Sequence, residues 1–232
     1  MMPISVQSVL GLVMKRQPEL GREVDIPTTP RTEVYSQNCI GYSQARIPMT
    51  NPGAVTVILG SMYSGKSTAL LYHLKRAMIA KKEVVLFKPR IDDRYSKDEV
   101  VSHDGESLPA ILLDSHKDIL GQIGTAEVIG LDEVQFLDVE VWRVVDILSL
   151  LGKTVFIAGL STDFMGQPFE TSARVAMISD KIEKLTAVCV KCGEDAVWTQ
   201  MVSDGVEVTD GDRVQVGGLE LYEPRCRRCF VK

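Results

Sequence analysis

Eight consecutive residues combine two glycines, a lysine and a serine at the spacing that a phosphate-binding loop requires. They are Gly60, Ser61, Met62, Tyr63, Ser64, Gly65, Lys66 and Ser67. The two glycines let the backbone turn tightly, so that its N–H groups can point at a chain of phosphates. The lysine adds a cation for the outer phosphates, and the serine hydroxyl is a ligand for Mg²⁺. This pattern predicts that the loop binds a nucleoside triphosphate, and leaves open what receives the phosphate.

The residues on either side supply the context that such a loop needs. Residues 55–59 form a β-branched, apolar run that predicts a buried strand, and apolar residues recur at helical spacing over 69–79. A loop that leads into a helix also benefits from the attraction of the helix N-terminus for anions. A chance pair of glycines in an ordinary turn is the alternative. The strand, the lysine-serine pair and the helix together argue against it.

A second chemical landmark is the acidic pair Asp132 and Glu133, which ends an apolar run over 128–131. An acid at the end of a buried strand is where a protein with a phosphate loop places the carboxylate that supports Mg²⁺. Glu133 is then a candidate general base, because successive side chains at a strand end diverge and can serve two roles. A solvated acidic turn is the alternative, and the phosphate loop upstream disfavours it.

Residues 160–169 predict a loop that closes over a ligand. The segment is punctuated by Gly166 and Pro168 and carries Phe164 and Phe169, and a helix pattern follows from residue 171. The pattern alone equally allows both phenylalanines to be ordinary core aromatics.

Four of the five cysteines fall in two C-x-x-C pairs near the C-terminus, Cys189 with Cys192 and Cys226 with Cys229. Four thiolates from two such turns suit tetrahedral Zn²⁺. The interval between the pairs is longer than in the usual zinc ribbon, so the metal should close a long loop. A redox-active pair is the alternative, but a single pair would be enough for that chemistry. Cys39 stands apart and is interpreted as incidental.

Alternating strand and helix patterns, with the P-loop motif after the first strand, predict an α/β fold with a mostly parallel sheet flanked by helices. Further strands are expected at 83–87 and 154–159. A short strand and turn is expected over 100–105, a short strand followed by a helix over 112–123, and a helix over 139–151. We expect a P-loop α/β nucleotide-binding domain at 53–186 and a small zinc-binding domain at 187–232, with strands at 196–201 and 213–216. Residues 1–52 are rich in Pro and polar residues and predict a flexible extension, either a plain tail or a partner-binding arm.

The composition of the chain limits the kinds of partner that it is expected to bind. A net charge of −5 and an isoelectric point near 5.3 weigh against nucleic acid as the main partner. No apolar run approaches the length of a membrane span, and the N-terminus lacks a basic-then-apolar signal pattern. We therefore expect a soluble, cytoplasmic protein that does not bind a membrane.

Several segments, taken in order, resemble the type II thymidine kinase family, whose members carry a zinc-bound lasso. The matching segments are 60–67, 88–95, 102–105, 132–136, 164–169, 185–193, 216–218 and 222–229, so the resemblance runs from about Gly53 to the C-terminus. It implies ATP-dependent phosphorylation of the 5′-hydroxyl of thymidine or deoxyuridine, in pyrimidine deoxynucleotide salvage. It also implies a RecA-like sheet, a zinc-binding lasso domain at 187–232, a homotetramer and feedback binding of dTTP.

The resemblance further implies roles for individual residues. Glu133 would be the catalytic base, while Ser67 and Asp132 would bind Mg²⁺. The ATP-binding set would be Gly60, Ser61, Met62, Tyr63, Ser64, Gly65, Lys66, Ser67, Thr68, Asp92, Arg94, Asp132 and Gln135. The nucleoside-binding set would be Phe136, Leu160, Phe164, Phe169, Thr199, Gly217, Gly218 and Tyr222.

Two departures from the family and two rival readings bear on these expectations. Ser161 stands where the family commonly has Asp, and residues 1–52 have no counterpart in compact members.

The first rival reading, a RecA-like ATPase or nucleic-acid-associated module with a zinc ribbon, would share the loop and the acids. It predicts a basic groove and leaves the two phenylalanines unexplained. The other rival, a catalytically inactive nucleotide sensor, is disfavoured by intact Lys66, Asp132 and Glu133.

Overall fold

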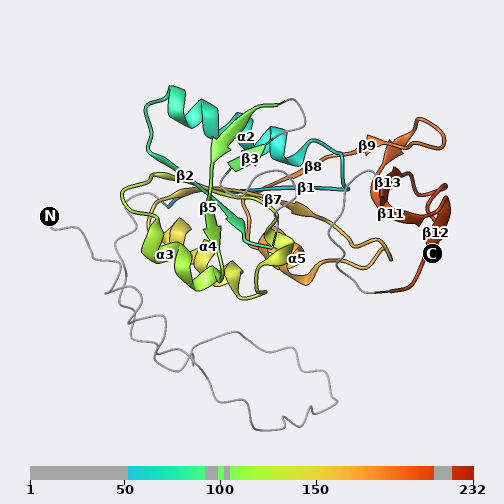
Figure 1. Ribbon diagram of the computed structural model, residues 1–232. Coiled ribbons are helices and arrows are strands. Elements are labelled where there is room, and N and C mark those ends of the chain that lie inside the picture. Colours follow the sequence, from blue (N-terminus) through green and yellow to red (C-terminus); the bar gives the residue numbers. More distant parts are fainter. Residues whose placement is uncertain (1–51, 92–98, 102–104, 212–220) are drawn as a thin grey trace, which may run out of the picture. The chain divides into compact units, whose positions relative to one another are not determined.

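A sheet of six parallel strands, in the order β5-β2-β6-β7-β1-β8, organises the part of the chain that the structure describes (Figure 1). The structure is a computed structural model and describes residues 52–91, 99–101, 105–211 and 221–232. The strands are β1 (Val55–Gly60), β2 (Val84–Pro89), β5 (Ile111–Leu113), β6 (Val128–Leu131), β7 (Thr154–Leu160) and β8 (Lys181–Lys184). All pairings in this sheet are parallel, which confirms the predicted fold class.

Helices cover both faces of the sheet. Helix α2 (Lys66–Ile79) lies on one face, and α3 (Ile119–Gln122), α4 (Val141–Leu150) and α5 (Glu170–Met177) lie on the other (Figure 1). The leucines of α2 are fully buried and pack in one cluster with side chains of β1 and β2. Because both faces are covered, every residue of β1 and β6 is buried, and these strands read in the sequence as unbroken apolar runs.

The parallel arrangement decides where chemistry can occur. The phosphate loop follows β1, the acidic pair follows β6, and residues 161–169 follow β7. Because β1, β6 and β7 are parallel, these three segments emerge at the same edge of the sheet, which is where α/β proteins bind ligands. A short ribbon of β3 (Glu99–Val101) and β4 (Ser107–Pro109) is also present.

Small antiparallel sheets make up the C-terminal part. Strand β9 (Ala187–Val188) pairs with β10 (Asp195–Ala196), and β11 (Trp198–Ser203) pairs with both β12 (Val206–Val208) and β13 (Tyr222–Arg225). The strand expected at 196–201 is interrupted at residue 197, between β10 and β11. The strand expected at 213–216 lies outside the described residues, as does the predicted extension up to residue 51.

Strands β4, β8, β9, β12 and β13 have no counterpart in the sequence-based expectations. Strand β8 pairs only with β1, and most of its Lys-Ile-Glu-Lys residues are exposed, so its sequence shows no apolar run. Strand β13 contains Pro224, a residue that disfavours a strand assignment. The domain boundaries at 52/53 and 186/187 stay a prediction. Among the described residues, no helix combines the length and the apolar character needed to cross a membrane.

Candidate active site

The two glycines of the phosphate loop are needed for different physical reasons. Gly65 immediately precedes α2 and has φ +80°, in the left-handed region that glycine tolerates best. A Cβ at Gly65 would meet no atom within 4 Å, so backbone conformation alone favours glycine there. At Gly60 space decides, because a Cβ would stand 2.2 Å from Ser64 Oγ and 2.8 Å from the carbonyl oxygen of Leu185.

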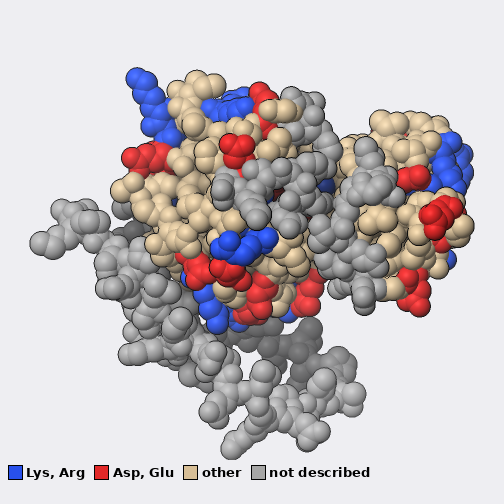
Figure 2. Space-filling view, viewed as in Figure 1, with Lys and Arg blue, Asp and Glu red and all other residues tan. Residues whose placement is uncertain are grey.

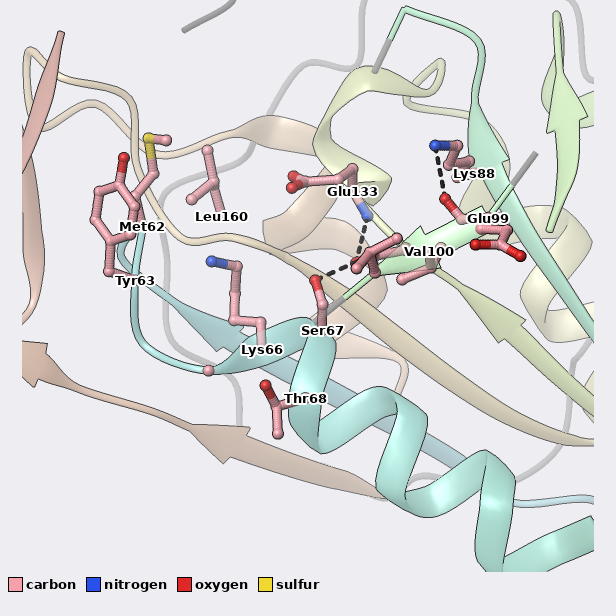
Figure 3. Close-up of a pocket in the computed structure, with 13 residues that line it drawn as sticks. Met62, Tyr63, Lys66, Ser67, Thr68, Lys88, Glu99, Val100, Glu133 and Leu160 are labelled. Atoms are coloured by element: carbon pink, nitrogen blue, oxygen red, sulfur yellow. Dashed lines mark hydrogen bonds between the residues drawn. The ribbon is translucent and has the colours of Figure 1, made fainter. Parts of the chain in front are cut away.

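The loop and the acidic pair line one pocket (Figure 3). Lys66 is 8% exposed, and its Nζ donates a hydrogen bond of 2.8 Å to the carbonyl oxygen of Ser61 within the loop. Ser67 Oγ donates to Asp132 Oδ2 at 3.0 Å, which joins α2 to the end of β6. The pocket is lined by Met62, Tyr63, Gly65, Lys66, Ser67, Thr68, Lys88, Glu99, Val100, Val101, Asp132, Glu133 and Leu160.

The sequence interpretation missed one wall of this pocket. Lys88, at the end of β2, is 3% exposed, and its Nζ donates to the carbonyl oxygen of Glu99 in β3 at 3.0 Å. A lysine inside an apolar strand, at the edge where ligands bind, is a signal that could have identified it. Of the predicted nucleotide-binding residues, Asp92 and Arg94 lie outside the described residues.

Asp132 carries the chemistry that a cation site needs. Burial and the negative charge of Glu133 raise its pKa to about 7, against the opposing effects of Ser67, the Glu133 N–H and Lys66. The Glu133 N–H donates to Asp132 Oδ1 at 3.0 Å. A buried carboxylate beside a hydroxyl and a second carboxylate offers hard oxygen ligands and an excess of negative charge. This donor set fits Mg²⁺.

Glu133 reaches the pocket from an unusual backbone conformation. It has φ +49°, in the left-handed region, and it precedes the 3₁₀ turn η2 (Val134–Phe136). Its half-buried side chain points into the same space as Lys66 and Leu160 (Figure 3). Strained backbone of this kind is concentrated at functional sites. Gln135 lies behind it, 7% exposed, and its Nε2 donates to the Glu133 carboxylate.

Most described members of the predicted nucleoside-binding set gather in one apolar cluster. Its buried members are Met62, Leu160, Phe164, Phe169, Met201 and Tyr222. Thr199 lies beside it, since its Oγ1 accepts from the N–H of Met62 at 2.9 Å. Phe136 instead lines a separate depression with residues at the ends of β2 and β5. Gly217 and Gly218 lie outside the described residues.

Residues 161–169 form a hydrogen-bonded loop rather than an irregular one. Asp163 is 3% exposed, and its Oδ1 accepts from the N–H groups of Met165 at 3.1 Å and Gln167 at 2.8 Å. Thr162 and Pro168 form an isolated antiparallel bridge across the base. Phe164 and Phe169 are buried, so they are core aromatics of the apolar cluster as well as residues of the loop. Ser161 Oγ is buried without a hydrogen-bond partner among the described residues.

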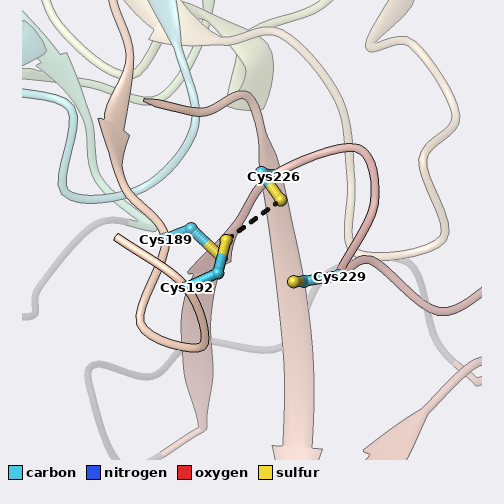
Figure 4. A group of neighbouring side chains, drawn as sticks. All are labelled: Cys189, Cys192, Cys226 and Cys229. Carbon is cyan, nitrogen blue, oxygen red and sulfur yellow. Dashed lines mark hydrogen bonds between the residues drawn. The ribbon is translucent and has the colours of Figure 1, made fainter. Parts of the chain in front are cut away.

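The two cysteine pairs meet in one place (Figure 4). The Sγ atoms of Cys189, Cys192, Cys226 and Cys229 all lie within 4.8 Å of one another, and those of Cys192 and Cys226 are 3.5 Å apart. Tetrahedral Zn²⁺ with bonds of about 2.3 Å needs sulfurs about 3.8 Å apart, so the cluster fits this ion.

The thiols are also unequal in acidity. Burial raises the pKa of Cys189, but several backbone N–H groups outweigh it and bring the pKa down to about 6. Hydrogen bonds with Cys192 and Cys226 raise the pKa of Cys229 to about 12. Four neighbouring thiols cannot all ionise without a cation among them, which is the situation that a metal relieves.

The cysteine-bearing part of the chain contacts the phosphate loop directly. Besides the bond from Met62 to Thr199, Ser61 Oγ donates to the carbonyl oxygen of Ala196 at 3.3 Å. Two adjacent residues of the loop are therefore attached to β10 and β11.

A phosphate loop between a strand and a helix, with paired acids at the end of a neighbouring parallel strand, defines a P-loop nucleotide-binding α/β protein. Within that class, a model of the thymidine kinase family matches residues 53–230, and the chain belongs to this family. The cysteine cluster near the C-terminus is consistent with its zinc-lasso type.

Solved structures give a weaker comparison. One match is the replication initiator DnaA bound to AMPPCP and single-stranded DNA, with 15% identity and a TM-score of 0.35 over 57% of this chain and 40% of that one. Another is AMPPCP-bound DnaA from Aquifex aeolicus, with 15% identity and a TM-score of 0.35 over 58% and 41%. The chain thus spans about 40% of each.

On the face shown in Figure 2, Lys and Arg side chains are interspersed with Asp and Glu.

Proposed function

We propose that this chain is an ATP-dependent thymidine kinase, which transfers the γ-phosphate of ATP to the 5′-hydroxyl of thymidine or deoxyuridine. One observation carries the proposal: Lys66, Ser67, Asp132 and Glu133 line a single pocket, and Leu160 belongs both to that pocket and to the apolar cluster. A phosphate donor site and an apolar acceptor site are therefore adjacent. Membership of the thymidine kinase family supports the same substrate class.

In this proposal the protein contributes mainly alignment and charge. The loop N–H groups and Lys66 bind the phosphates of ATP, and Lys66 neutralises charge that grows on the transferred group. Ser67 and Asp132 would hold Mg²⁺, which would supply charge neutralisation to the bound phosphates. Glu133 accepts the proton of the 5′-hydroxyl as that oxygen forms its bond to phosphorus and the bond to ADP breaks.

The acceptor is proposed to lie against the apolar cluster. Phe164, Phe169 and Tyr222 are the buried aromatic members of this cluster, and we propose that they pack around the pyrimidine and its sugar. From the family resemblance we also propose contacts from Asp92 and Arg94 to the phosphates, and from Gly217 and Gly218 to the base. Phe136 is proposed for the base on the same grounds.

Assembly and regulation remain proposals from the family resemblance. We propose a homotetramer, feedback binding of dTTP and a zinc ion held by the four cysteines. Light scattering tests the assembly, and competition between dTTP and thymidine tests the feedback site. Metal analysis should find about one zinc per chain.

The decisive assay is conversion of labelled thymidine to its monophosphate in the presence of MgATP. Glu133→Gln should lower kcat by roughly 10²- to 10⁴-fold, the usual contribution of a general base. Glu127→Gln is the matched control, because Glu127 is exposed and precedes the same strand. Full activity in Glu133→Gln would refute the assignment of the base. DNA-stimulated ATP hydrolysis without phosphorylation of any deoxynucleoside would refute the proposed function.

A further inference from the structure

Both ends of the Gln135 side-chain amide are engaged beneath the active site. Its Nε2 donates a hydrogen bond to Glu133 Oε2, and its Oε1 accepts from the backbone N–H of Leu160 at 2.9 Å. The side chain is 7% exposed. Gln135 therefore connects the proposed base, after β6, to the last residue of β7, which belongs to the apolar cluster.

The direction of this amide is fixed by its neighbours. The Leu160 N–H can only donate, so the carbonyl end of Gln135 must face it. The NH₂ end is then directed at the Glu133 carboxylate, which accepts. A reversed amide would oppose two donors at one end and two acceptors at the other, so one orientation is strongly preferred.

The neighbouring backbone leaves room for this side chain. A Cβ at Gly159 would stand 3.0 Å from Gln135 Oε1 and 2.7 Å from Val134 Cγ1, so any larger residue would displace the 3₁₀ turn. Glu133 itself has its left-handed backbone anchored by the bond from its N–H to Asp132 Oδ1. The backbone of Glu133 is thus held by one contact and its carboxylate is oriented by another.

We propose that Gln135 is a positioning residue that orients the Glu133 carboxylate toward the acceptor hydroxyl, and that it does not bind the nucleotide. The proposal rests on the proposed function, because it assigns to Glu133 the role of base. The amide bond limits rotation of the carboxylate about its terminal torsion, which is otherwise soft. Its attachment to Leu160 further couples the base to the wall that the nucleoside would contact.

Kinetics separate this role from ligand binding and from general packing. Gln135→Met keeps the length and apolar bulk of the side chain but removes both hydrogen bonds. We expect kcat to fall roughly 10- to 100-fold, the usual effect of a misplaced reacting group. The KM values for ATP and thymidine should change less than about threefold. Ser172→Ala is the control, because Ser172 Oγ lies beside Gly159, buried and without a hydrogen-bond partner among the described residues. It should leave kcat unchanged.

A double-mutant cycle tests the coupling to the base. In a Glu133→Ala background, Gln135→Met should lower the residual kcat by less than about twofold, because the group that it orients is gone. An equal loss in both backgrounds would overturn the proposal. So would a rise in KM for ATP with kcat preserved, which would make Gln135 a nucleotide ligand.

The contact can be tested without any turnover. With ¹⁵N-glutamine labelling, the side-chain amide signal that disappears in Gln135→Met identifies Gln135. That signal should shift in Glu133→Ala and stay in place in Ser172→Ala. A signal insensitive to Glu133→Ala would overturn the proposed contact. Absence of thymidine phosphorylation by the unaltered chain would instead refute the proposed function, and the amide signal would still decide whether Gln135 contacts Glu133.

Discussion

Replacing Asp132 by Asn should make the metal-free protein more stable while abolishing the proposed kinase activity. Asp132 is buried next to Glu133, and both burial and that neighbouring charge raise its pKa from 3.8 to about 7. At pH 8 the carboxylate is nonetheless ionised, so the fold carries an unfavourable charge where Mg²⁺ is expected. Asn has the same shape and no charge. Its Oδ1 can accept from the Glu133 N–H while its NH₂ donates to Ser67 Oγ, which reverses the bond with that hydroxyl.

The size of the effect follows from the pKa shift. A rise of about 3 units corresponds to about 4 kcal/mol at 1.4 kcal/mol per unit, which is an upper bound for one group. Asn must also reverse the hydrogen bond with Ser67, which offsets part of this gain, so we expect about 2 kcal/mol of added stability at pH 8. For a chain of this size that is a rise in Tm of about 4–8 °C.

The pH dependence has a defined sign. A carboxyl whose folded pKa is raised destabilises the fold fully above that pKa. The destabilisation diminishes as pH falls below 7, because the folded state then takes up the proton while the unfolded state does not. The advantage of Asp132→Asn should therefore shrink from pH 8 toward pH 5.

Thermal unfolding in EDTA at pH 8 and pH 6 is the assay, with Asp146→Asn as the control because Asp146 is exposed on α4. Excess EDTA would also remove zinc, so a magnesium-free buffer without chelator serves as a second condition. Adding MgADP should stabilise the unaltered protein and not the variant. If Asp132→Asn lowers Tm at pH 8, or its advantage is the same at both pH values, the reasoning is refuted.

Two further predictions concern the C-terminal sheets. Cys226→Ser should lose bound zinc and most soluble protein, measured by metal analysis and yield, and a native metal-free chain would contradict the site. Arg225 is 3% exposed in its side chain and pairs with Glu223 and with Glu207 at 3.4 Å. Arg225→Met should destabilise the fold by about 3 kcal/mol and speed zinc release to a chelator. An unchanged release rate would show that these ion pairs do not brace the cysteine cluster.

The sequence allowed prediction of the strands whose run of apolar residues directly reflects burial on both faces of the sheet. Strands β1 and β6 are covered on both faces, so their apolar runs identified them and, with them, the loop and the acids that follow. Strand β8 escaped notice because it lies at the edge and is largely exposed. Lys88 escaped notice because a single charged residue in an apolar run does not reveal that its Nζ reaches a pocket wall eleven residues away.

The spacing of residues along the sequence does not show which groups donate to a polar side chain and which accept from it. The family resemblance groups Gln135 with the nucleotide-binding residues, without showing which groups its amide contacts. Its burial and its contact with Leu160 depend on a turn after β6 packing against the end of β7, two segments that the sequence relates only through the sheet. A polar residue next to a catalytic one is therefore ambiguous until its partners are known.

The same limit applies to the link between the phosphate loop and the cysteine-bearing sheets. Met62 and Thr199 are separated by 137 positions, yet the N–H of one donates to the hydroxyl of the other at 2.9 Å. A residue inside the loop motif thus has one hydrogen bond fixed by β11, which pairs with β13, and β13 leads directly into Cys226. The cysteine cluster can influence the loop through this path without touching a substrate. A zinc ion bound by the cluster would therefore be expected to affect the geometry of the phosphate loop as well as the stability of the sheets that carry it.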